Sequence, residues 1–216
     1  MSANKLPDEL QDPVDTTILR YTQHVLPYLK NTNHTPNDVT TYSLICGLLS
    51  VLLLYNGSVA AFCVLFIMSY IFDCMDGQMA RKYDMVTKDG DAYDHATDWI
   101  VYILLVLVMY HRYKNVKGRF FVLAVLILML IGTCIYTGCQ QAYTKENGVH
   151  ATREFQDIFI PLAVPNGIHV ARYTGFGCLM LLVVGCLLFL EYMKNSDDKN
   201  DTEKGQPKLT CFACVK

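Results

Sequence analysis

The chain has 216 residues, a formal net charge of −2 and a hydrophobic fraction of 52%. Its mean hydropathy of +0.24 is high for a soluble protein. The near-neutral charge, without a basic stripe interleaved with aromatic residues, excludes nucleic acid as a partner. The length suffices for one domain, and several apolar runs are long enough to span a bilayer. The composition therefore predicts an integral membrane protein.

The N-terminal segment, residues 1–34, is polar and lacks the pattern of a cleavable signal peptide. Within it, residues 15–30 scatter apolar side chains among polar ones. That pattern favours a short helix lying on the membrane surface. We therefore expect a cytosolic or interfacial segment ahead of the membrane domain.

The apolar runs predict an all-α, polytopic membrane bundle. A helix rises about 1.5 Å per residue, so each run matches a hydrocarbon core of about 30 Å. The runs cover residues 38–56, 58–80, 91–111, 118–139 and 173–193.

A sixth stretch, 155–171, carries two prolines, an aspartate and a histidine, which are costly in a lipid-facing helix. We expect it to form a kinked sixth span, with a re-entrant segment as the alternative. The bundle of about six transmembrane helices then occupies residues 35–193, and the polar tail 194–216 is expected to be disordered.

Basic residues do not orient the chain. They occur both in the 81–90 loop and in the 112–119 loop, and consecutive loops face opposite sides of a membrane. We expect a multi-pass protein of the endoplasmic reticulum in a eukaryotic host, and of the plasma membrane otherwise.

Four aspartates mark the junction of the second and third runs. Asp73 and Asp76 lie near the end of one run, and Asp94 and Asp98 lie near the start of the next. Carboxylates in hydrophobic helices are costly and need a compensating partner. At about 100° per residue, each pair lies on one face of its helix, and a short loop brings the two faces to the same side. Clustered carboxylates favour a pair of hard cations, Mg²⁺ or Mn²⁺.

Other residues of this segment fit a metal-dependent phosphate site. Gly77 and Ala80 are small and would let a bulky group approach the helix backbone. Arg81 could hold a phosphate through two parallel hydrogen bonds. One alternative is that the aspartates are solvated at the membrane edge and paired with Arg81 and Lys82. A second is an intramembrane carrier of cations or protons, in which carboxylates line a pathway.

The segment resembles the signature of the CDP-alcohol phosphotransferases, membrane enzymes that make phospholipids. Their pattern is D-x2-D-G-x2-A-R-x8-G-x3-D-x3-D. This chain matches every fixed position, namely Asp73, Asp76, Gly77, Ala80, Arg81, Gly90, Asp94 and Asp98. The resemblance implies transfer of a phosphatidyl or phospho-alcohol group from a CDP-activated donor to an alcohol hydroxyl, with release of CMP.

The resemblance also implies roles for single residues. Asp73, Asp76 and Asp94 would bind two divalent ions, and Asp98 would be both a ligand and the general base. CDP would contact Asp73, Gly77, Ala80 and Arg81. The upstream run Thr35-Pro36-Asn37-Asp38-Val39-Thr40 is similar to the family's entry into its first span, so Asn37 and Thr40 would also hold the nucleotide. Helix capping is the other interpretation of that run.

The substrate pair stays open between two subgroups. The run from Gly90 to His95 resembles that of choline- and ethanolaminephosphotransferases, with Asp91 where those enzymes carry glutamate. His95 would then be a second candidate for the catalytic base. The chain length is closer to phosphatidylinositol or phosphatidylglycerophosphate synthases. The donor would be CDP-diacylglycerol or a CDP-aminoalcohol, the acceptor a polar alcohol or diacylglycerol. Relatives suggest a homodimer in the bilayer.

Overall fold

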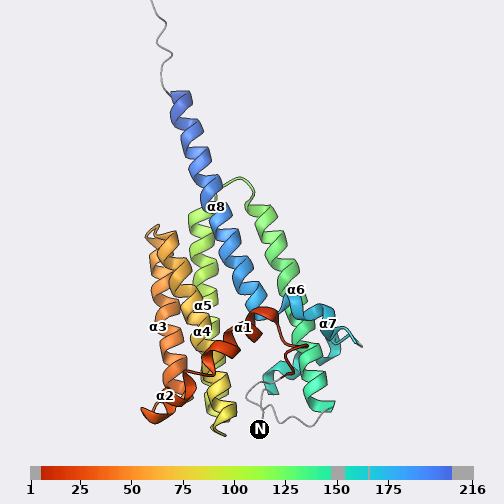
Figure 1. Cartoon of the computed structure of the whole chain (residues 1–216). Coiled ribbons are helices and arrows are strands. Elements are labelled where there is room, and N and C mark those ends of the chain that lie inside the picture. The colour runs from red at the N-terminus through yellow and green to blue at the C-terminus, as the bar shows by residue number, and fades with distance from the viewer. Residues whose placement is uncertain (1–5, 147–153, 165, 206–216) are drawn as a thin grey trace, which may run out of the picture.

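A computed structural model describes residues 6–146, 154–164 and 166–205 of the chain (Figure 1). Every regular element in these ranges is a helix. The longest helices run side by side as a bundle, and two short N-terminal helices cross one end of it. The predicted all-α membrane bundle is confirmed.

Five helices in the described ranges are long and apolar enough to cross a membrane. Each coincides with an expected apolar run and extends beyond it at one or both ends. They are α3 (Pro36–Tyr55), α4 (Val59–Lys82), α5 (Lys88–Tyr113), α6 (Arg119–Glu146) and α8 (Phe176–Gly205). The last helix continues past residue 193, where we expected the membrane domain to end, and residues 206–216 of the expected tail lie outside the described ranges.

The expected sixth span is wrong. Residues 155–171 fall in a nine-residue 3-10 helix, η1 (Glu154–Leu162), and a four-residue helix, α7 (Ile168–Ala171), which η2 (Arg172–Thr174) connects to α8. A 3-10 helix rises about 2 Å per residue, so η1 is too short to cross a core of about 30 Å. Instead, η1 packs against α6, where the backbone carbonyl of Phe159 occupies the space beside Gly138 that a side chain would need.

The N-terminal segment forms two helices, α1 (Pro13–Thr22) and α2 (Leu26–Asn31), where one had been expected. They lie at the end of the bundle where α4 ends (Figure 1). Helix α1 packs against α4 and α8, with Leu19 and Thr22 buried beneath it. The amphipathic pattern therefore marks the face that α1 turns toward the bundle.

One carboxylate fastens α1 to α8. Asp12 caps the start of α1, where its Oδ1 accepts hydrogen bonds from the backbone N–H groups of Val14 (2.7 Å) and Asp15 (3.2 Å). Its Oδ2 accepts a third, from the backbone N–H of Cys178 in the first turn of α8 (3.1 Å). A side chain at Gly175 would overlap the Asp12 carboxylate, so this close approach requires glycine. Both helix N-termini thus share one anion, which their dipoles stabilise.

Small and hydroxyl side chains let α3, α4 and α5 pack closely. The hydroxyls of Ser43 and Ser69 each donate a hydrogen bond of 2.8 Å to the other residue's backbone carbonyl. These two bonds join α3 to α4. One turn further along α3, Gly47 faces Val101 of α5: a Cβ there would lie 2.7 Å from a Val101 methyl carbon. This contact sets the distance between α3 and α5, the helix that carries Asp94 and Asp98.

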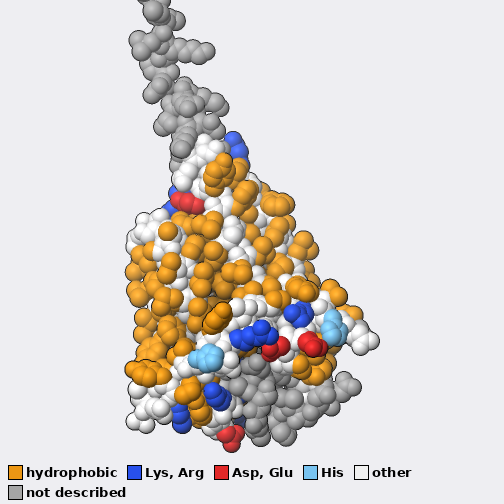
Figure 2. Space-filling model, in the orientation of Figure 1, with side chains coloured by type: hydrophobic (Ala, Val, Ile, Leu, Met, Phe, Trp, Pro, Cys, Tyr) orange, Lys and Arg blue, Asp and Glu red, His pale blue; other side chains and the backbone are white. Residues whose placement is uncertain are grey.

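The outer surface has the distribution that a bilayer requires. Hydrophobic side chains cover the middle of the visible face, while charged side chains gather mainly toward the end at which α1 and α2 lie (Figure 2). Large apolar residues such as Ile103, Val106 and Leu107 are exposed on α5. Lipid tails would cover this belt, because exposing so large an apolar surface to water is unfavourable.

The Gly47 contact can be tested with a matched pair of variants. We expect Gly47→Leu to lower the free energy of unfolding by about 1–3 kcal/mol, because the new side chain overpacks the α3–α5 interface. Gly185→Leu on α8 meets only open space and should leave stability nearly unchanged. Thermal unfolding in detergent measures both, and equal melting temperatures for the two variants would contradict the packing argument.

Candidate metal and substrate site

Three of the motif aspartates come together between α4 and α5. Asp73 and Asp76 lie near the C-terminal end of α4, and Asp94 lies near the start of α5. One carboxylate oxygen from each lies within 4.8 Å of the other two. The start of α5 is fixed by Thr87, whose hydroxyl accepts a hydrogen bond from the backbone N–H of Gly90 (3.1 Å). The predicted convergence of the two acidic helix faces is present in the structure.

The surroundings of these carboxylates favour a bound cation. Asp76 and Asp94 are only 3% and 8% exposed. Carboxylates this close in a poorly solvated setting repel one another unless a positive charge lies between them. The donor set consists of oxygens, which suits Mg²⁺ or Mn²⁺. The residues present therefore fit a divalent metal site.

Thr40 supports one of these aspartates. Its hydroxyl donates a hydrogen bond of 2.5 Å to Oδ2 of Asp76. A partner of this kind orients a carboxylate that could bind a metal ion. We had expected Thr40 to contact the nucleotide, and the observed bond gives it a supporting position behind the acidic cluster.

Asp98 lies one turn beyond Asp94 and lines the same cavity as Asp73 and Asp94. It is outside the set of oxygens that lie within 4.8 Å of one another. His95 also lines the cavity, and its Nε2 is 3.8 Å from Oδ1 of Asp91, one turn earlier. Both residues expected to compete for the role of base therefore border the same space.

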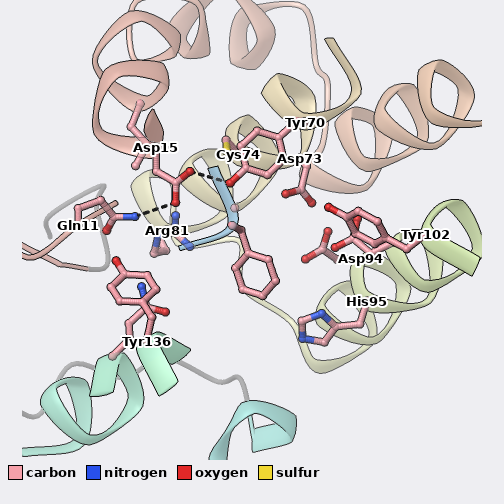
Figure 3. Close-up of a pocket in the computed structure, with 15 residues that line it drawn as sticks. Gln11, Asp15, Tyr70, Asp73, Cys74, Arg81, Asp94, His95, Tyr102 and Tyr136 are labelled. Atoms are coloured by element: carbon pink, nitrogen blue, oxygen red, sulfur yellow. Dashed lines mark hydrogen bonds between the residues drawn. The ribbon is translucent and has the colours of Figure 1, made fainter. Parts of the chain in front are cut away.

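The cavity has a volume of about 140 Å³ and is partly open to solvent. Its wall comes from α1, α4, α5, α6 and the start of α8 (Figure 3). Gly77 and Arg81 are in this wall, as expected for residues that would contact CDP, whereas Ala80 is not among the described residues that line it.

At the start of α3, some polar residues cap the helix and one does not. Thr35 and Asp38 form a capping box, each side chain accepting a hydrogen bond from the other's backbone N–H. Asn37 does not take part in that box. Its Oδ1 would lie 3.1 Å from a Cβ placed on Gly90, so it reaches the start of α5. Helix capping thus accounts for only part of this run.

Several residues of the cavity wall were missed by the sequence analysis. Tyr70 and Tyr102 could have been found by helical spacing, because Tyr70 lies one turn before Asp73 and Tyr102 one turn after Asp98. Asp15 and Tyr136 come from α1 and α6, and no local pattern relates them to the motif. Only the tertiary fold brings these two residues to the site.

Asp15 has an unusual environment. Its Oδ1 accepts a hydrogen bond of 2.6 Å from the Tyr70 hydroxyl, and its Oδ2 accepts one of 3.4 Å from the Gln11 amide. Burial, together with the nearby charge of Asp12, raises the pKa of Asp15 from 3.8 to about 7. The cost of removing this carboxylate from water therefore outweighs the two hydrogen bonds that favour its ionised form.

Comparison with known proteins identifies the family. The model of the CDP-alcohol phosphatidyltransferase family matches residues 33–194, which is most of the chain. The chain belongs to this family. It is also similar to a phosphatidylcholine synthase from Borreliella burgdorferi, with 26% identity over 180 residues that cover 82% of this chain and 75% of the relative. No solved structure matches. The protein is thus a multi-pass membrane transferase of phospholipid synthesis.

The role of Thr40 can be tested by removing its hydroxyl. We expect Thr40→Val to weaken Mn²⁺ binding by about 10- to 100-fold, because Asp76 loses the donor that orients it. Thr40→Ser keeps the donor and should bind Mn²⁺ nearly as wild type does. Electron paramagnetic resonance titration of Mn²⁺ measures both affinities. Equal weakening in the two variants would show that the methyl group, not the hydroxyl, matters.

The raised pKa of Asp15 predicts a pH dependence of stability. The folded protein binds this proton more tightly than the unfolded chain does, so the stability that this group contributes is full below about pH 4 and is lost as the pH rises through about 7. In metal-free detergent solution, the melting temperature should fall more between pH 5 and about pH 8 for wild type than for Asp15→Asn. Asp8→Asn, an exposed position paired with Arg20, is the control that should follow wild type. Parallel curves for wild type and Asp15→Asn would contradict the prediction.

Proposed function

We propose that the protein transfers a phosphatidyl or phospho-alcohol group from a CDP-linked donor to an alcohol hydroxyl and releases CMP, with two divalent ions held by the motif aspartates. The observation that carries this proposal is the convergence of Asp73, Asp76 and Asp94. Asp73 and Asp94 line a cavity together with Gly77 and Arg81. Family membership supports the same reaction class. It also disfavours the alternative of a cation or proton carrier.

Each motif residue then has a task in the cavity. Asp73, Asp76 and Asp94 would hold the ions, which supply positive charge against the diphosphate and the leaving CMP. Arg81 would bind a phosphate oxygen from the cavity wall. Gly77 leaves the helix backbone open to the nucleotide, and Asn37 would reach it from the start of α3.

The acceptor hydroxyl needs a base to remove its proton. Asp98 borders the cavity one turn beyond Asp94, and as a carboxylate near the ions it could take the proton or hold a further ligand position. His95 is the second candidate, and Asp91 near its Nε2 would stabilise its protonated form. We assign the role to Asp98 first, because the family pattern fixes an aspartate there and does not fix the histidine.

The name of the Borreliella relative supports a phospholipid product with an aminoalcohol headgroup. Two substrate pairs lead to such a product: CDP-diacylglycerol with a free aminoalcohol, or a CDP-aminoalcohol with diacylglycerol. A homodimer and the membrane compartment stay predictions from the family and the host.

CMP release from purified protein tests the proposal. We expect turnover with one of the two substrate pairs, dependent on Mn²⁺ or Mg²⁺. Asp94→Asn should lower the rate by a factor of about 100 or more, because it removes a ligand charge next to the reacting phosphates. Asp89→Asn, outside the cluster in the first turn of α5, is the matched control and should retain activity. Full activity of Asp94→Asn, or turnover in the presence of EDTA, would contradict the proposal.

A further inference from the structure

We propose that Asp15 and the aromatic rings beside it bind the ammonium group of a cationic alcohol, so that helix α1 selects the headgroup of the product. This inference rests on the proposed function, since it names the chemistry of the alcohol that the same cavity accepts. Asp15 lies ahead of residues 33–194, the part of the chain that the family model matches.

Asp15 lies across the cavity from Asp94 and His95, whereas Arg81 of the motif stands on the Asp15 side (Figure 3). In Figure 3, Asp15, Gln11 and Tyr136 stand on one side of the space, and Asp94 and His95 stand on the other. Residues of both groups line one continuous cavity. A group bound at Asp15 would therefore extend toward the metal-binding end without leaving the cavity.

The charge of Asp15 calls for a positive ligand. The hydrogen bonds that Asp15 accepts come from neutral groups, Tyr70 and Gln11, and the adjacent Asp12 adds further negative charge. Arg81 lines the same cavity and, in the proposed function, binds a phosphate oxygen of the donor. The raised pKa of Asp15 has the same cause. A cation in the cavity would favour the ionised form, and ionised Asp15 would in turn favour a cation.

The aromatic rings of the cavity wall favour an alkylated ammonium over a neutral polyol. The cavity wall includes four aromatic rings, from Tyr70, Tyr102, Tyr136 and Phe176. Two of their hydroxyls already have protein partners: the Tyr70 hydroxyl donates to Asp15, and the Tyr136 hydroxyl donates to the carbonyl of Leu10 while accepting from the N–H of Asp12. These rings therefore offer carbon surface rather than hydrogen bonds. Aromatic surface beside a carboxylate suits a quaternary ammonium, whereas a polyol would leave its hydroxyls unpaired.

Binding measurements on the full-length protein test this inference. The probes are choline and its uncharged carbon isostere, dimethylbutanol, titrated by calorimetry in detergent. We expect wild type to bind choline at least about tenfold more tightly than the isostere, because only choline carries the charge. Asp15→Asn should weaken choline binding by about tenfold or more, and its binding of CMP should stay within about twofold of wild type. CMP binding also serves as the check that the variant is folded.

Three further variants separate the effect of the Tyr136 ring from that of its hydroxyl and from general damage to the fold. Tyr136→Leu should weaken choline binding several-fold, and Tyr136→Phe should retain most of it, because the ring is kept. Asp8→Asn, on the exposed surface of the same N-terminal segment, should bind choline as wild type does. Equal affinities of wild type and Asp15→Asn for choline, or equal affinities of wild type for choline and the isostere, would overturn the inference.

The source of the ammonium group is read from a second titration. If the donor carries it, Asp15→Asn should weaken CDP-choline binding far more than CMP binding; if the acceptor carries it, free choline alone should show the loss. Efficient CMP release with a neutral alcohol, unaffected by Asp15→Asn, would overturn this inference and leave the proposed reaction intact. Absence of CMP release with every substrate pair, alongside choline binding that Asp15→Asn abolishes, would overturn the reaction and leave the cation site.

Discussion

The mutual repulsion of three carboxylates is the constraint on which the rest of the structure depends. Asp73, Asp76 and Asp94 place oxygens within 4.8 Å of one another at the end of a membrane bundle. Such a cluster is unfavourable in a medium that solvates charge poorly, and only precise helix placement with a cation between the groups makes it tolerable. The serine pair between α3 and α4, and the glycine that admits Val101, hold the backbones at the required separation. The packing of these helices therefore determines whether the three carboxylates are placed to hold a cation.

The cavity wall includes residues inside and outside the part of the chain that the family model matches. The wall that carries Asp73 and Asp94 comes from α4 and α5, within the matched residues 33–194. The opposite wall includes α1, which lies before them. In the proposed function, the aspartates that would hold the ions can stay the same while the residues of the opposite wall, which would contact the alcohol, change. In this protein, the opposite wall presents the carboxylate of Asp15 and nearby aromatic rings to the cavity.

Sequence reasoning found what is local and missed what depends on the tertiary fold. Hydrophobic run length located five spans, and helical spacing placed the aspartates on facing surfaces. The stretch 155–171 misled the analysis because its apolar residues have the composition of a span while Pro161 prevents a regular helix of spanning length. Tyr70 and Tyr102 lay within reach of the same spacing argument. Asp15 and Tyr136 did not, because nothing in the sequence shows that α1 and α6 border one cavity.

The shared capping of α1 and α8 by Asp12 has a consequence for how the molecule is assembled. The carboxylate of Asp12 and the N–H of Cys178 are separated by 166 positions along the chain. During synthesis, the helices that bear the motif emerge long before Cys178 does, so the metal-binding half can insert early. The contacts of α1 with α4 can form earlier, but its bond to α8 and the part of the cavity wall that α8 supplies form only when the last span arrives. The complete cavity is therefore a late product of biogenesis.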